Sequence, residues 1–242
     1  MISVKKIVEY YEELFPISEQ QKVFYDELTK NYQKPVKFLR FGCGTGTFES
    51  YLSKLGHDVT GVDIHNDFLN SANLRKRNQL MAIRFFQMNY TDASKYLGKG
   101  FYNVISILNS RLFDFHSREE ILDFLKACKI LLAPGGKIIV EHVNFDAFDG
   151  ISFIQFPVRE SVRAKLYSEI TNTHDEQKFT MTLENGSGRI STIIDDYPVY
   201  KFRPNELVEI AREAGYEKTE LFAGFSKSPF IGKEAKFTAI IQ

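Results

Sequence analysis

The sequence predicts an α/β fold with a mostly parallel sheet, interrupted late in the chain by an antiparallel β insertion. Strand-like and helix-like patterns alternate from residue 36 to about residue 143, which is typical of parallel sheets with helices on both faces. Segment 102–108 is nearly all apolar, as a strand covered on both faces should be. After residue 150 the period changes to the alternation of antiparallel strands.

The elements before the insertion follow from the spacing of apolar residues and from turn signals. Residues 3–31 are expected to form two helices, because apolar residues recur at helical spacing and Pro16 breaks the run. Ala-Pro-Gly-Gly at 133–136 ends a helix and starts a strand. The expected order after residue 35 is strand 36–41, helix 46–55, strand 58–63, helix 66–78, strand 83–87, a loop with a short helix at 89–98, strand 102–108, helix 117–131 and strand 137–143.

The insertion is expected to contain three strands. Alternating β-branched and aromatic residues mark them near 161–171, 178–183 and 189–194. Asn185-Gly186 is the turn signal of a hairpin between the last two. Helix 204–214, with Pro204 in its first turn, and two strands at about 216–223 and 234–241 follow.

These elements divide the chain into two expected parts. The main domain comprises residues 1–149, with N-terminal helices within 3–31, and residues 199–242. The insertion, residues 150–198, is expected to cover a substrate site as a lid.

Composition excludes several classes of function. The 242 residues are 43% hydrophobic and 26% charged, which suits a large globular domain. Its 31 basic and 31 acidic residues cancel, which argues against non-specific binding to nucleic acid. Two unrelated cysteines suggest neither a disulfide framework nor a metal site. Without a leader-like or membrane-spanning run, we expect a cytoplasmic protein that binds no membrane.

The segment Gly42-Cys43-Gly44-Thr45-Gly46 follows the first strand and precedes a helix. Glycines at alternate positions allow positive φ and close approach of a ligand, and a helix N-terminus presents free N–H groups. A tight βα turn without a ligand is the alternative interpretation.

The acidic residue Asp63 ends the second strand, 17 residues after Gly46. An acid at this place can accept hydrogen bonds from two ribose hydroxyls. The third glycine comes one residue earlier than in the Gly-x-Gly-x-x-Gly pattern that holds a pyrophosphate. The spacing therefore favours a nucleoside ligand without phosphate and disfavours oxidoreduction with NAD.

With these two motifs the chain resembles the class I S-adenosylmethionine-dependent methyltransferases over nearly its whole length. The resemblance implies a Rossmann-like methyltransferase fold, a mostly parallel seven-stranded sheet and S-adenosyl-L-methionine as cofactor. It also implies that the glycines hold the methionine part and that Asp63 binds ribose. The remaining cofactor contacts it implies are Ile64 against adenine, Asn89 at the adenine edge, Tyr90 over the base and Leu108 at the end of strand 102–108.

Three short motifs also resemble glycine N-methyltransferase: Asn109-Ser110, Asn144-Phe145-Asp146 and Asp196-Tyr197-Pro198. This implies substrate contacts from Asn109, Asn144 and Tyr197, with Asn144 the foremost candidate. Arg111-Leu112-Phe113 departs from that family's pattern, so the identity of the acceptor is not carried over.

Catalysis of methyl transfer depends mainly on positioning and desolvation, so the site needs no catalytic triad. His142 alternates with Asn144 along one strand, so both are candidate catalytic residues, with His116 a second candidate base. Structural or solvated histidines are the plainer alternative.

Cations and aromatics outside these motifs also have two interpretations. Arg159, Arg163 and Arg189 could clamp a carboxylate or simply face solvent. Tyr10, Tyr11 and Phe15 could cover the cofactor or pack in a core.

Arg40 is a departure from the class, which has an acid two residues before the first glycine. A reversed charge there would weaken the site unless an acid such as Glu49 compensates.

The leading hypothesis is therefore a methyltransferase acting on a small molecule, at an amine nitrogen. The alternatives are a cofactor-binding or inactive protein with a regulatory role, suggested by Arg40, and a methyltransferase acting on protein or RNA. The exposed strands of the insertion could also pair between two copies as a homodimer.

Overall fold

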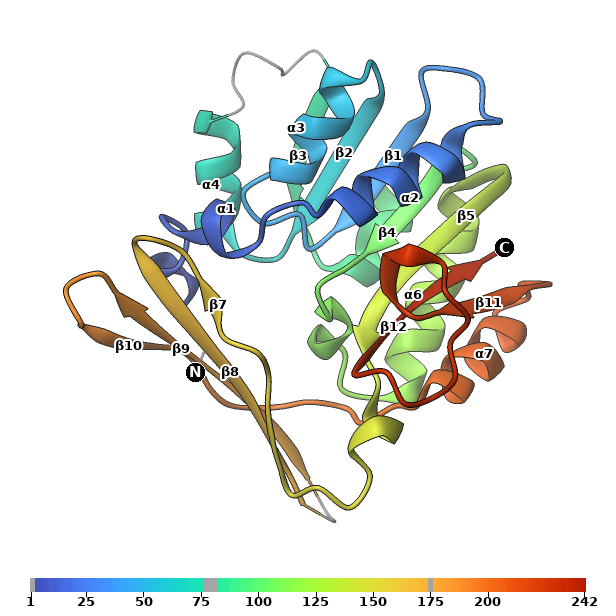
Figure 1. Cartoon of the computed structure of the whole chain (residues 1–242). Helices are drawn as coiled ribbons and strands as arrows, with labels where there is room; N and C mark the ends of the chain where they lie inside the picture. The colour runs from blue at the N-terminus through green and yellow to red at the C-terminus, as the bar shows by residue number, and fades with distance from the viewer. Residues whose placement is uncertain (1–2, 76–81, 174–175) are drawn as a thin grey trace.

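The computed structural model describes residues 3–75, 82–173 and 176–242. Its main feature is a seven-stranded sheet in the order β11-β12-β5-β4-β1-β2-β3 (Figure 1). The strands are β1 Lys37–Phe41, β2 Asp58–Asp63, β3 Ile83–Gln87, β4 Tyr102–Ile107, β5 Leu132–Val143, β11 Thr219–Phe222 and β12 Lys236–Ile241. The predicted fold class is confirmed.

Strands β5, β4, β1, β2 and β3 are parallel, so their carboxyl ends meet along one edge. β12 joins β5 in antiparallel register, with Ala239 opposite Val140, and β11 pairs with β12. The chain order reverses between β1 and β4, where a crevice opens beyond the carboxyl ends of the strands. The functional candidates after β1, β2 and β4 therefore lie close together.

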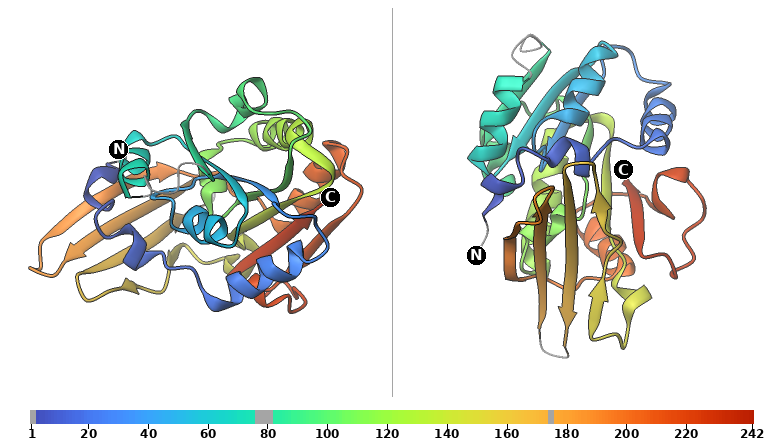
Figure 2. Two further views of the ribbon diagram at one scale, coloured as in Figure 1. Left: turned by 90° about the horizontal axis from the view of Figure 1, so that it is seen from above. Right: turned by 60° about the vertical axis from the view of Figure 1, so that its left-hand side comes forward.

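Helices cover both faces of the sheet, as the alternation predicts (Figure 2). On one face, Phe24 and Phe48 pack over Phe38 and Val104 in a single buried cluster. On the other face, α6 and α7 bury apolar residues against the same strands. The helices are α2 Glu19–Thr29, α3 Thr47–Lys54, α4 Asn66–Arg75, α5 Ala93–Tyr96, α6 Arg118–Leu131 and α7 Pro204–Glu213.

The insertion forms a second, five-stranded antiparallel sheet, which we call the lid sheet. Three of its strands were expected, and two short ones, β6 and β7, carry too few residues for an alternating pattern. Figure 1 shows the lid sheet lying across the end of the molecule where the parallel strands finish. Its strands are β6 Phe153–Gln155, β7 Arg159–Glu160, β8 Ala164–Asn172, β9 Gln177–Asn185 and β10 Ile190–Pro198.

The first of the two N-terminal helices expected within residues 3–31 is not continuous. It consists of a 3₁₀ turn, η1 Val4–Lys6, and a one-turn helix, α1 Tyr11–Leu14. The reason is tertiary: Ser3 N donates to Ile193 O at 2.7 Å, and Val4, Ile7 and Leu14 are buried with lid residues and Phe68. The segment therefore bridges the lid sheet and α4.

Helix 66–78 was expected to run beyond Arg75, and its last residues lie outside the described residues. Within the described parts of the chain, none of the helices has the length and apolar character needed to cross a bilayer. The same parts contain no group of three or more His, Cys, Asp or Glu side chains arranged to hold a metal ion.

Candidate active site

The glycine turn between β1 and α3 has three residues in the left-handed region. The φ angles are +69° at Gly42, +57° at Gly44 and +76° at Gly46. Cys43 N donates to Val62 O at 3.1 Å, so the turn is fixed to the end of β2. Only glycine adopts such angles without strain, which explains the spacing of the motif.

Asp63 lies directly against this turn. Its Oδ2 accepts a hydrogen bond from Gly44 N at 2.9 Å, and its Oδ1 accepts one from His65 N at 2.9 Å. The side chain is 1% exposed. Two backbone donors therefore hold a charged carboxylate at the strand end, and each oxygen retains a lone pair for a further donor.

Two side chains of the protein lie on the open side of the glycines. A Cβ built on Gly42 would come within 2.7 Å of Arg111 Cγ, and one on Gly44 within 2.5 Å of Tyr11 Cε1. Because Gly42 and Gly44 have no Cβ, the side chains of Arg111 and Tyr11 can pack directly on the turn.

Arg111 is directed there by an unusual loop after β4. Asn109 and Ser110 both have φ of +57°, and Asn109 N donates to Glu141 Oε2 at 2.6 Å. This reversal returns the chain toward the turn after β1. Residues other than glycine rarely take this conformation, and such strain concentrates at functional sites.

The Arg111 guanidinium joins a buried polar network. Its Nη2 lies 2.9 Å from Asp114 Oδ2 and 3.9 Å from Asp63 Oδ1, and it donates to Tyr90 Oη at 3.2 Å. Burial lowers the pKa of Arg111, but Asp114, Tyr90 and Asp63 raise it by more, so the pKa of Arg111 is well above its ordinary value. Burial raises the pKa of Asp114, although Arg111 opposes that shift.

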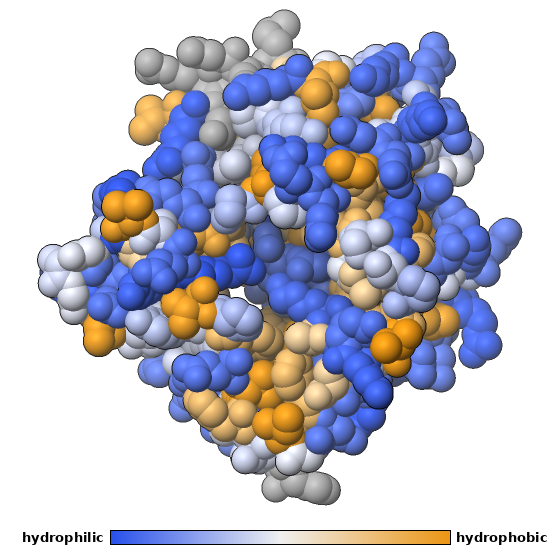
Figure 3. Space-filling model, in the orientation of Figure 1, coloured by the Kyte–Doolittle hydropathy of each residue, from blue (hydrophilic) through white to orange (hydrophobic). Residues whose placement is uncertain are grey.

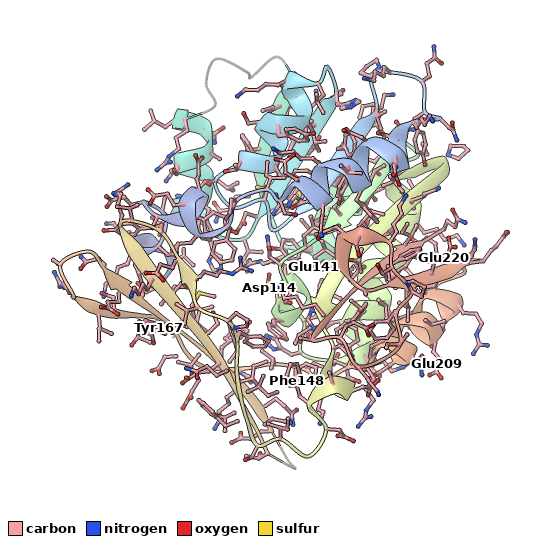
Figure 4. All side chains as sticks on the ribbon, viewed as in Figure 1. Asp114, Glu141, Phe148, Tyr167, Glu209 and Glu220 are labelled. Atoms are coloured by element: carbon pink, nitrogen blue, oxygen red, sulfur yellow. The ribbon has the colours of Figure 1, made fainter. Side chains whose placement is uncertain are left out.

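A cavity of about 380 Å³ lies between the lid sheet and the carboxyl ends of the parallel strands. Figure 3 shows a hollow near the centre of the molecule, and Figure 4 places Asp114 and Glu141 on the side of the main sheet that faces the lid. The lid contributes apolar side chains, and the main domain contributes most of the polar ones. The residues used below are Tyr11, His65, Asn109, Arg111, Asp114, Phe179, Met181, Tyr197 and Lys236.

Arg40 is compensated by Glu49. Arg40 is 7% exposed and Glu49 is fully buried, with Arg40 Nη1 3.4 Å from Glu49 Oε1. Burial of Arg40 works against its charge, but the Glu49 carboxylate outweighs it and raises the pKa of Arg40. The guanidinium points to α3 and lies over the Phe48 ring, 5.5 Å from its centroid. It does not cover Asp63.

Two of the predicted substrate residues, Asn109 and Tyr197, line the cavity. Gly42 and Gly44 lie beneath Arg111 and Tyr11, and Gly46 lies against Phe85. The three glycines and Asp63 are not part of the cavity wall among the described residues. Tyr11 and Phe15 also line the cavity, which supports the covering interpretation of these aromatics, whereas Tyr10 packs under the Arg163 guanidinium.

The structure argues against His142 and Asn144 as catalytic or substrate residues. His142 is fully buried between the rings of Phe113 and Phe202, with centroids 4.7 and 4.6 Å away. Asn144 is fully buried, and its amide donates to Gly232 O and Glu234 O while its Oδ1 accepts from Asp146 N. Both side chains point into the protein interior, so the face that His142 and Asn144 share packs in the core and does not face the cavity.

Of the other residues expected to contact the cofactor, Tyr90 is buried against Phe41 and contacts Arg111 through its hydroxyl. Leu108 is buried in the cluster beneath α2, and Ile64 packs on the opposite core cluster. Asn89 is exposed at the start of the 3₁₀ turn η3 Tyr90–Asp92. None of these four lines the cavity among the described residues.

Sequence reasoning missed Arg111 and Asp114 as members of the site. The available signal was position, because both follow the predicted end of strand 102–108, where a parallel sheet places its functional loops. The departure at Arg111-Leu112-Phe113 from the glycine N-methyltransferase pattern marks the same loop.

Residues 38–136, which include most of β1, all of β2 to β4, the glycine turn and Asp63, match the family model described as a methyltransferase domain. This part of the chain is therefore similar to a methyltransferase domain. The match supports the predicted class of methyltransferase. The similarity to glycine N-methyltransferase stays a prediction.

A curated relative of this methyltransferase domain is the ubiquinone biosynthesis O-methyltransferase of Colwellia psychrerythraea. It is 27% identical over 123 residues, which cover 48% of this chain and 45% of that protein. The chain therefore spans about half the length of this relative.

Two solved structures share the fold over almost the whole chain. The CcbJ methyltransferase from Streptomyces caelestis has a TM-score of 0.81 at 19% identity and covers 99% of this chain and 96% of its own. CalS10 from Micromonospora echinaspora is an amino pentose methyltransferase solved with S-adenosylmethionine bound. It has a TM-score of 0.69 at 18% identity, and the alignment covers 100% of this chain and 98% of CalS10. Both likenesses include the lid sheet.

The residues of the methyltransferase domain fit S-adenosylmethionine once two side chains turn aside. Gly42 and Gly44 leave a space over the turn that a Cβ would fill, and the Asp63 carboxylate is fixed beside this space. Arg111 and Tyr11 are long side chains on loop and one-turn segments, so rotation can free this space without moving the sheet.

Proposed function

We propose that the protein is a methyltransferase that transfers one methyl group from S-adenosylmethionine to a small molecule, at an amine nitrogen. The observation that carries this proposal is the contact between Asp63 and the glycine turn, next to a cavity closed by the lid sheet. S-adenosylmethionine supplies an activated methyl group on sulfur. The protein contributes binding, orientation and exclusion of water.

Each part of the site has a role in this function. Asp63 accepts hydrogen bonds from ribose, since two backbone amides already hold its oxygens in place. The glycine turn leaves room for the methionine part. Asn109 and Tyr197 contact the acceptor, and the apolar lid residues Phe179 and Met181 keep water from it.

A small acceptor is supported by the cavity, whose volume of about 380 Å³ lies under the lid sheet. The neutral net charge points the same way. An amine acceptor is supported by the fold shared with CalS10, an amino pentose methyltransferase.

Isothermal titration with S-adenosylmethionine tests the cofactor part. Wild-type protein should bind at micromolar concentration, and Asp63→Ala should bind at least tenfold more weakly, because a charge-assisted hydrogen bond contributes about 1.5–3 kcal/mol. A Glu220→Ala variant, changed on β11 at the far edge of the sheet, is the control (Figure 4). Failure of the wild type to bind at millimolar concentration contradicts the proposal.

Turnover tests the acceptor part. Release of S-adenosylhomocysteine should be measured with matched panels of primary amines, amino sugars, phenols and alcohols. Turnover with amines only supports the proposed nitrogen, and turnover with hydroxyls only contradicts it.

The second candidate is a cofactor-binding protein without transferase activity. The observation that favours it is the occupation of the glycine face by Arg111 and Tyr11. It predicts cofactor binding without product from any panel member.

A further inference from the structure

We propose that Tyr197 and His116 form a proton relay that carries the acceptor's proton from the cavity to solvent. The inference rests on the proposed function and deepens it, because it limits the acceptor to compounds that must lose a proton when they are methylated.

Tyr197 reaches the cavity through an irregularity in the lid sheet. Strand β10 shifts register between Ile194 and Tyr197, and Asp196 has a φ of +44°. A bulge of this kind redirects a side chain and is common beside active sites. Tyr197 lines the cavity from the lid, opposite the loop that carries Asn109 and Arg111.

The Tyr197 hydroxyl lies 3.0 Å from His116 Nε2, at hydrogen-bond distance. His116 belongs to the main domain, between the 3₁₀ turn η4 Arg111–Asp114 and α6, and it is exposed. Its backbone N donates to Glu120 Oε2 at 2.8 Å, which fixes the loop to α6. The pair therefore joins a phenol on the cavity wall to an imidazole in contact with solvent.

Several of the other titratable groups at the cavity are already paired. Asp114 pairs with Arg111, and Lys236 Nζ lies 3.1 Å from Glu141 Oε1. His65 follows Asp63 at the cofactor end, and burial lowers its pKa. His142, the other histidine proposed from the sequence, is enclosed by phenyl rings.

The charged groups that act on Tyr197 are Asp114, Arg111 and Glu120. Burial, with Asp114 and Glu120, raises the pKa of Tyr197, while Arg111 lowers it. The phenol therefore stays protonated near neutral pH and does not act as a stored base. It can accept one proton only while it donates its own, which is the behaviour of a relay.

The proton balance of methyl transfer is complete with this pair. As the acceptor's amine nitrogen gains the methyl group from S-adenosylmethionine, its proton passes to Tyr197 Oη. The Tyr197 proton passes to His116 Nε2, and His116 releases a proton from Nδ1 to water. An imidazole is suited to this step because one ring nitrogen can accept a proton while the other releases one.

The probe for this relay is 4-nitrophenol, a small apolar hydroxyl compound whose anion is yellow. The probe is titrated spectroscopically with protein at several pH values near neutrality, with no cofactor present. The variants are Tyr197→Phe and His116→Gln, and Tyr167→Phe is the matched control. Tyr167 lies on β8 of the same lid sheet (Figure 4), and its hydroxyl donates to Glu184 Oε2 at 2.9 Å, away from the cavity.

Wild type and Tyr167→Phe should ionise the bound probe about tenfold more readily than Tyr197→Phe and His116→Gln, with probe affinity and melting temperature nearly unchanged. Equal ionisation in wild type and His116→Gln overturns the relay, as does failure of the wild type to bind the probe. Because the experiment contains no S-adenosylmethionine, it is independent of whether the proposed transfer reaction occurs.

Discussion

The buried imidazole of His142 shows how one residue can be chemically suggestive and structurally inert. Both ring nitrogens lack a hydrogen-bond partner among the described residues, and phenyl rings pack on either side. Burial, aided by the charge of Lys236, lowers the pKa of His142 well below its ordinary value. In the folded protein this residue stays neutral where an exposed histidine would already be charged.

His142 should therefore make stability depend on pH. Below about pH 6.5 the unfolded chain takes up a proton that the folded protein refuses, so the free energy of unfolding falls by up to about 1.4 kcal/mol per pH unit. His142→Phe should remove this part of the slope, as measured by urea unfolding between pH 5 and about pH 8. An unchanged slope would show that His142 is charged in the native state.

Gly46 carries a second prediction at this scale. An added Cβ would lie 2.4 Å from Phe85 Cζ, at a φ of +76°. Gly46→Ala should lower the free energy of unfolding by about 2–4 kcal/mol, through backbone strain and overpacking.

Phe85→Ala separates the two causes in a double-mutant cycle. The truncation should recover the overpacking part of the Gly46→Ala effect and leave about 1–2 kcal/mol of backbone strain. Complete recovery would mean that the left-handed conformation carries no cost.

Among the elements, the N-terminal segment is tied to the lid by exposed ion pairs. Arg163 of the lid contacts Glu9 and Glu13, and Arg159 Nη1 donates to Leu14 O at 3.3 Å. Because Tyr11 of this segment lies on the glycine turn, we expect these ties to the lid to slow the rotation of Tyr11 that uncovers the turn.

Arg163→Gln should speed cofactor association several-fold, as followed by surface plasmon resonance with S-adenosylhomocysteine. Exposed ion pairs contribute about 0–1 kcal/mol each, so the melting temperature should change little. Arg189→Gln, on the same lid but exposed beside the β9–β10 turn, should bind like the wild type. Equal association rates for wild type and Arg163→Gln would contradict a gating role.

At the same scale, sequence patterns predicted the regular elements best. Strands 58–63 and 83–87 have the predicted bounds, although only the first is buried along nearly its whole length and the second is a largely exposed edge strand. The N-terminal helix was wrong because Val4, Ile7 and Leu14 bury against the lid and α4, which local spacing does not show. Likewise, the orientation of His142 and Asn144 depends on the register of β5, which strand periodicity does not determine.

In the whole molecule, the lid and the main sheet share a core. Phe113, Val143 and Phe145 of the main domain cluster with Ile154, Ile170 and Phe179 of the lid. We therefore expect both parts to unfold in one cooperative transition.

S-adenosylhomocysteine at 100 times its dissociation constant should stabilise the whole molecule by about 2.7 kcal/mol. For a chain of this size that raises the melting temperature by about 5–10 °C in calorimetry. The transition should stay single, and Asp63→Ala, which we expect to bind at least tenfold more weakly, should show about half that shift or less at the same ligand concentration. Two separate transitions, with only one of them shifted, would show that the lid folds independently.

The buried partnership of Arg40 with Glu49 also limits how this protein can change. An acidic residue at position 40 would bring two carboxylates together inside the protein. Replacing Glu49 alone by a neutral residue would leave the buried Arg40 guanidinium without its carboxylate partner. Either single step costs about 3–5 kcal/mol, a large share of the stability of a typical domain. Any descendant that regains the common motif must therefore exchange both positions together, or cross a poorly folded intermediate.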